Sequence, residues 1–148
     1  MSNQVRQVEK VSDIIKVLRA GAEFYEDAKD EVKENRIEVF FDRMADQKRQ
    51  AAESLQSFSI AEQGEMETGE AVSVNMRKLY TDIVSLISTN KTHTVISQLE
   101  EVEDKILEVI DEALEEDQPD TCARALRKLR AQMQENHDEM KALQKATH

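Results

Sequence analysis

Glu103 and His137 are the side chains whose type and spacing best suit chemistry in this sequence. Each interrupts a row of apolar residues at helical spacing, so its polar group is expected to face the protein interior or to lie at its edge. Carboxylate and imidazole groups bind iron, manganese or zinc, and a buried pair can also satisfy each other by hydrogen bonding. The apolar neighbours are Ile96, Leu99, Ile106 and Ile110 around Glu103, and Met133 and Met140 around His137.

Two interpretations of this pair differ in what completes the site. In the first, Glu103 and His137 hold one metal ion with help from Gln134 or Glu101. In the second, Arg49 or His137 pairs with Glu103, because an unpaired buried carboxylate carries a large desolvation cost. We favour the second, a buried polar cluster of Glu103, Arg49 and His137, in which His137 is a core histidine rather than a ligand.

Helices must position these residues, because the 148-residue chain has only 3 glycines and 1 proline and lacks tryptophan. Asn35 is expected to end the first helix in a left-handed conformation, and residues 59–70 are expected to form a loop that ends at a Thr68 cap. Apolar residues at alternating spacings of three and four predict long helices at about 5–34, 37–58, 94–117 and 121–145.

A shorter helix is predicted at about 71–88, and it decides the topology. As a helix this segment would span about 27 Å, enough to carry the chain back along a bundle of long helices. The second and third long helices would then run parallel, with one long crossover between two antiparallel hairpins. We therefore expect an all-α fold in a single domain over residues 1–148, a four-helix bundle with an additional crossover helix.

Four segments carry a resemblance to a known family. The sequence resembles the bacterial ferritin-like four-helix-bundle family of unknown function, and the resemblance implies a ferritin-like bundle and brings no established reaction. Members of that family tend to show Gly-Glu in the middle of the first and third long helices, where this chain has Gly21-Ala22 and Val102-Glu103. The segments are GAEFYEDAKDEV (21–32), FFDRMADQKRQAAESLQ (40–56), QLEEVEDKILEVIDEAL (98–114) and ENHDEMKAL (135–143).

A complete di-metal centre is not expected. Ferritin-like oxidases hold two metal ions with a Glu from each of two helices and a Glu-x-x-His from each of the other two. Here the last motif reads Gln134-x-x-His137, Ala22 takes the inward position of the first helix, and Lys48-Arg49 offers cations where a metal needs anions. About two of six ligands are present.

The expected function is accordingly non-catalytic: an interaction or stress-associated protein of the cytoplasm, without a cofactor unless it binds a divalent ion. The alternative is a metal-binding oxidoreductase that uses iron, manganese or zinc with atypical ligands. A third interpretation is a metal store on the acidic run over residues 100–117. The start of the chain, MSNQVRQVEK, lacks the apolar segment of a signal peptide, which favours a cytoplasmic address.

Charge and hydropathy limit the partners. A net charge of −11 at pH 7 disfavours nucleic acid, and no apolar run is long enough for a membrane span. Cys122, the only cysteine, occupies an apolar seam and is expected to be a buried thiol rather than a redox centre. Phe24, Phe40 and Val39 fall outside the main seams, so we expect a homo-oligomer or another protein to cover them. The basic cluster Arg124, Arg127, Lys128 and Arg130 is expected to face the acidic run.

Overall fold

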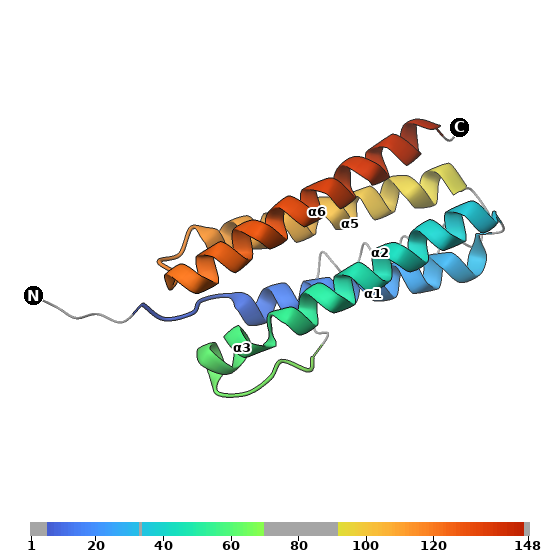
Figure 1. Cartoon of the computed structure of the whole chain (residues 1–148). Coiled ribbons are helices and arrows are strands. Elements are labelled where there is room, and N and C mark those ends of the chain that lie inside the picture. Colours follow the sequence, from blue (N-terminus) through green and yellow to red (C-terminus); the bar gives the residue numbers. More distant parts are fainter. Residues whose placement is uncertain (1–5, 33, 70–91, 147–148) are drawn as a thin grey trace, which may run out of the picture.

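The computed structural model describes residues 6–32, 34–69 and 92–146, and in these ranges all regular structure is helical (Figure 1). The predicted all-α fold is confirmed for this part of the chain, while the predicted crossover helix over 71–88 lies outside it. None of the described helices has the length and apolar character needed to span a membrane. The helices are α1 (Val11–Glu31), α2 (Asn35–Ser54), α3 (Gln56–Gln63), α5 (Thr92–Leu114) and α6 (Asp120–Ala146).

Two antiparallel hairpins lie against each other along their length. The first is α1 with α2, the second is α5 with α6, and α1 packs on α5 to join the two. Figure 1 shows that α2 and α5 run in the same direction, which is the parallel arrangement expected from the sequence. Tyr25 of α1, Lys48 of α2 and Glu103 of α5 come from the middle parts of three helices, of which α1 packs against both α2 and α5.

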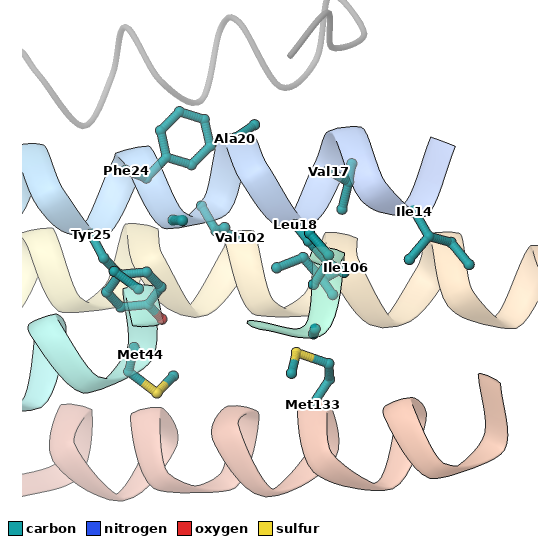
Figure 2. Close-up of a cluster of buried hydrophobic side chains, with 14 of the residues drawn as sticks. Ile14, Val17, Leu18, Ala20, Phe24, Tyr25, Met44, Val102, Ile106 and Met133 are labelled. Atoms are coloured by element: carbon teal, nitrogen blue, oxygen red, sulfur yellow. The ribbon is translucent and has the colours of Figure 1, made fainter. Parts of the chain in front are cut away.

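The apolar rows predicted from helical spacing form the core. Each long helix buries a stripe at intervals of three and four, because that spacing keeps side chains on one face. Figure 2 shows Tyr25 and Leu18 pointing from α1 into the bundle, while Phe24 and Ala20 point to the opposite side of the same helix. Fully buried members of the stripes include Ile15, Leu18, Phe41, Met44, Leu99, Ile106, Leu126 and Met133.

Polar contacts between α5 and α6 follow a regular pattern that we call the α5–α6 ladder. Arg130 binds Asp111 (Nε to Oδ1 2.5 Å), His137 binds Asp104 (Nε2 to Oδ1 2.6 Å), and Gln144 binds Ser97 (Nε2 to Oγ 2.8 Å). Successive pairs are seven residues apart on both helices, or two turns and about 10.5 Å. The expected meeting of basic and acidic runs is thus realised at Arg130, whereas Arg124, Arg127 and Lys128 are exposed.

Two predicted boundaries are wrong, for local reasons. Asn35 begins α2 instead of ending α1: Val32 is extended (φ −85°, ψ 128°) and buried, so the chain turns before Asn35 is reached. The second predicted helix breaks at Leu55, and α3 then continues through residues expected to be loop until Gly64 ends it with φ 85°. Glycine adopts that left-handed conformation without steric cost.

At one end of the bundle, buried or half-buried polar groups tie the first residues to both hairpins. The Gln118 side chain accepts a hydrogen bond from Glu9 N (2.9 Å) and donates to Glu9 O (2.6 Å). The Glu62 carboxylate accepts from the backbone amides of Lys10 (3.1 Å) and Ser12 (2.9 Å), so it caps the otherwise unsatisfied start of α1. We call these residues, Glu9, Lys10, Ser12, Glu62 and Gln118, the N-terminal clasp.

Candidate functional site: a charge cluster at the centre of the bundle

A lysine and a glutamate meet in the middle of the bundle without contact with solvent. The side chains of Lys48 and Glu103 are both 0% exposed, and Lys48 Nζ lies 2.7 Å from Glu103 Oε2. Burying two charges costs several kcal/mol per ion, and only close approach of the opposite charge offsets that cost. We therefore expect Lys48 and Glu103 to stay in contact as long as the bundle is folded.

Tyr25 completes the cluster from α1. Its hydroxyl donates a hydrogen bond to the same carboxylate atom, Glu103 Oε2, at 2.7 Å. Burial raises the pKa of Tyr25 well above its usual value, and the nearby Glu103 carboxylate raises it further through charge and through this hydrogen bond. Tyr25 is therefore a neutral hydrogen-bond donor at physiological pH. We call Tyr25, Lys48 and Glu103 the core charge cluster.

The stem of Lys48 packs beside a glycine of α1. A Cβ atom at Gly21 would lie 3.1 Å from Ile106 Cδ1, closer than most Cβ contacts in proteins, and 3.4 Å from Lys48 Cδ, at the edge of ordinary van der Waals contact. The ammonium also sits over the Tyr25 ring, 4.9 Å from its centroid, where the negative face of the aromatic system attracts a cation. The Tyr25 ring and the Glu103 carboxylate thus flank the ammonium group of Lys48, and Gly21 lies beside its stem.

The hydrogen-bond balance of the cluster is incomplete. Among the described residues, Glu103 Oε1 has no hydrogen-bond partner, and the ammonium of Lys48 has none with good directionality although it touches Oε2. Buried polar atoms without a hydrogen bond are costly. Charge attraction, more than hydrogen-bond geometry, therefore holds Lys48 against Glu103.

The cluster predicted from the sequence is corrected in two of its three members. Glu103 is buried as expected, but Arg49 is about half exposed and binds Glu26 (Nη1 to Oε1 3.1 Å), because it lies on the outer side of α2. His137 is 15% exposed and binds Asp104 instead of Glu103. Lys48, the neighbour of Arg49, supplies the cation that the prediction required.

The metal interpretation placed its ligands on Glu103 and His137, and the two side chains have different partners. Glu103 contacts Tyr25 and Lys48, whereas both ring nitrogens of His137 face aspartates, Asp104 and Asp138. The two additional ligands suggested from the sequence also have other surroundings. Gln134 donates to Asp138 (3.1 Å), and Glu101 is exposed.

The donor set at the centre does not fit the di-metal centre of the ferritin-like oxidases. Such a centre needs several carboxylates and imidazoles that converge on the ions, whereas the core charge cluster contributes one carboxylate, one neutral phenol and a fixed ammonium. A divalent ion beside Glu103 would face the positive charge of Lys48. Over residues 6–32, 34–69 and 92–146, no group of three or more His, Cys, Asp or Glu side chains could hold a metal ion.

The sequence held a signal for Lys48 that the prediction missed. Phe41, Met44, Ala51 and Leu55 follow the alternating spacing of a buried seam, and the position between Met44 and Ala51 belongs to Lys48. A lysine inside such a seam is buried only when an opposite charge meets it, and Glu103 stands in the corresponding seam of α5. Pairing the two interruptions would have identified the contact.

Two further features lie apart from the core charge cluster. Cys122 is buried as predicted; burial raises its thiol pKa to about 11, and it donates a weak hydrogen bond to Gln118 Oε1 at 3.5 Å. A groove of about 430 Å³ opens between α2 and α6, and none of its lining residues belongs to the cluster. They are Gln50, Ala51, Ser54, Leu55, Ala125, Lys128, Leu129 and Gln132.

Comparison with known proteins adds a family and no reaction. No curated protein and no solved structure matches the chain. One family model, described as a domain of unknown function (DUF2383), matches residues 6–116, which include the whole core charge cluster and end beyond α5. Because this match covers well over half of the sequence, the chain belongs to the DUF2383 family.

Proposed function

We propose that this protein is a ferritin-like helical bundle of the cytoplasm that acts by binding another protein or a second copy of itself, and that it catalyses no reaction. The observation that carries this proposal is the core charge cluster. Where a ferritin-like oxidase gathers carboxylates and imidazoles around metal ions, this chain places the ammonium of Lys48 2.7 Å from Glu103.

Burial also argues against catalysis at the cluster. Tyr25, Lys48 and Glu103 are all 0% exposed, and the groove between α2 and α6 does not reach them. A catalytic acid or base must come within hydrogen-bond distance of a substrate proton, directly or through one water molecule. A substrate would have to part α1, α2 and α5 to approach these groups.

The exposed apolar side chains support a role in binding. Val39 is 62% exposed on α2, next to Phe40, which packs partly against the core and carries Arg43 over its ring (5.1 Å to the centroid). Phe24, which the sequence suggested for the same surface, is only 3% exposed. Val39 and Phe40 thus remain as the proposed contact of an oligomer or a protein partner.

Metal content and oxygen chemistry test the proposal directly. We expect untagged protein to purify with less than about a tenth of an equivalent of iron, manganese or zinc, a value that Glu103→Ala leaves unchanged. Anaerobic loading with Fe(II) followed by oxygen should consume no more oxygen than free Fe(II) does. A stoichiometric metal that Glu103→Ala removes, or oxygen consumption that depends on Glu103, would establish the oxidoreductase instead.

Light scattering tests the proposal that the protein binds a second copy of itself or another protein. We expect an oligomer, or a stable complex with a co-purified protein, that Val39→Glu weakens, since a charge at this exposed position alters the surface without touching the core. Glu38→Gln at the adjacent, half-buried position is the control. A monomer at high concentration that retains no partner would refute this part and leave the charge-cluster argument standing.

A further inference from the structure

The surroundings of Lys48 Nζ are those of an ammonium-binding site. A carboxylate oxygen lies at 2.7 Å, an aromatic ring centroid lies at 4.9 Å, and the stem packs beside Gly21. Proteins that bind free ammonium ligands combine aromatic faces with a carboxylate in this way. In this protein the ammonium group belongs to the chain itself, as the end of the Lys48 side chain.

We propose that the centre of the bundle is a binding site for a primary ammonium group, filled in the native protein by Lys48 and open to a small alkylammonium ion once that side chain is shortened. This inference rests on the proposed function, in which Lys48 supplies the charge that a metal would otherwise supply. It goes further by naming the ligand class: a singly charged, hydrogen-bonding ammonium on a slender apolar stem.

Charge, size and hydrogen bonding each restrict the class of ligand that the site can bind. One carboxylate, Glu103, balances one positive charge, so a divalent ion would leave an excess that Tyr25, a neutral donor, cannot offset. The Lys48 stem lies against Gly21, where an added Cβ atom would lie 3.4 Å from Cδ and 3.6 Å from Cε, so we expect this close packing to favour a linear chain over a branched one. Glu103 Oε1, which is buried and has no partner among the described residues, offers a second acceptor to an ammonium that can rotate.

Lys48→Ala provides the first test, because it removes three carbon atoms and the ammonium, the size of n-propylammonium. We expect 100 mM n-propylammonium to raise the folded-to-unfolded ratio of Lys48→Ala on the order of tenfold at fixed ionic strength. Propan-1-ol, tetramethylammonium and Mn²⁺ should have no such effect. Lys105→Ala, which removes a half-buried lysine on the outer part of α5, should not respond to any of them.

A second test does not require Lys48→Ala to fold. In a Cys122→Ala background, Lys48→Cys is alkylated while unfolded, either with 2-bromoethylamine, which restores an ammonium at the lysine position, or with 1-bromopropane, which gives a neutral chain of the same length. We expect the aminoethyl form to refold with a folded-to-unfolded ratio at least tenfold above that of the propyl form. With Glu103→Gln added, the difference should disappear.

Equal stability of the two alkylated forms, or a more stable propyl form, would overturn the proposal. So would rescue of Lys48→Ala by propan-1-ol to the same extent as by propylammonium, since the site would then select shape alone. These outcomes are distinct from failure of the proposed function, which is judged by the metal content and oxygen consumption of the wild-type protein. A metal-free, inactive protein with no preference for ammonium would refute only the ammonium site.

Discussion

The core charge cluster and the α5–α6 ladder both join helices through polar side chains, and they differ in how far their charges are removed from solvent. Lys48 and Glu103 are 0% exposed, whereas Arg130 and Asp111 in the ladder are 38% and 47% exposed. Water and salt screen the second pair, but not the first. The cluster is thus expected to hold the packing of three helices, and the ladder to adjust one hairpin.

The two regions also differ in how strictly each one fixes the register of its helices. The ladder repeats every seven residues, so its spacing alone fits more than one register of α5 against α6. The cluster occurs once: a shift of α2 or α5 by one turn would separate the buried charges, and a shift of α1 would remove the Tyr25 hydrogen bond. A unique buried polar contact is the kind of device that fixes register at some cost in stability.

Breaking the buried pair from one side should have the largest effect. Lys48→Met leaves the Glu103 carboxylate buried without a cation, and we expect it to lower the free energy of unfolding by about 3–5 kcal/mol in urea denaturation. Lys48→Met with Glu103→Gln should recover much of that loss, because no isolated charge remains. Strictly additive effects of the two substitutions would show that the two groups are not coupled.

Removing the phenol should have a smaller effect and a pH signature. Tyr25→Phe deletes a hydrogen bond to a charged acceptor, which we expect to cost about 1.5–3 kcal/mol near neutral pH. Because the native pKa of Tyr25 is raised, the neutral phenol stabilises the wild type fully below pH 10, and this contribution is lost as pH rises above that value. Stability in Tyr25→Phe should therefore fall less steeply above pH 10.

Cys122 must be removed before that alkaline comparison is made. Its pKa is also raised in the native state, from 9.0 to about 11, so its contribution to stability is lost between those pH values. Unfolding curves from pH 7 to 11 in a Cys122→Ala background separate the two groups. Identical alkaline slopes with and without the Tyr25→Phe substitution in that background would contradict the assignment of Tyr25 as a buried neutral donor.

The N-terminal clasp lies between the two regions in burial and should lie between them in energy. Gln118 is 4% exposed and bonds both backbone groups of Glu9 and the carbonyl of Ala113 (2.8 Å). Gln118→Ala leaves those groups without their partner, so we expect a loss of about 1–3 kcal/mol. Hydrogen exchange at the Glu9 amide should accelerate more than exchange at Leu18, which lies inside α1.

The ladder should give the smallest response. Asp111→Asn removes an exposed ion pair with Arg130 and is expected to change the free energy of unfolding by about 0–1 kcal/mol, less in high salt. Asp104→Asn, which alters the carboxylate partner of His137, serves as the second member of the series. A loss from Asp111→Asn that approached the loss from Lys48→Met would reverse this ranking of the two regions.

Much of the architecture could be predicted from the sequence because it depends on local spacing. Intervals of three and four located the buried stripes, and the long middle segment predicted the parallel course of α2 and α5 that Figure 1 displays. Boundaries were less predictable, since the turn at Val32 and the break at Leu55 depend on what those residues pack against.

The candidate site was only half predictable. Glu103 interrupted an apolar row and was identified for that reason, but its partner was assigned to Arg49, one position away from Lys48. On a helix one position is a rotation of about 100°, which moved the predicted cation from the core to the surface. The contribution of Tyr25 and the space beside Gly21 depend on helix packing, which spacing within one helix does not reveal.

The clasp bears on where the folded unit starts. Gln118 holds Glu9 much as a neighbouring β-strand would, and Glu62 satisfies the amides that follow, although regular helix begins only at Val11. A version that begins at Val11 would keep every turn of α1 and still lose the hydrogen bonds of Glu9 and Lys10. Any excised domain intended for crystals or for spectroscopy should therefore retain the residues from Arg6 onward.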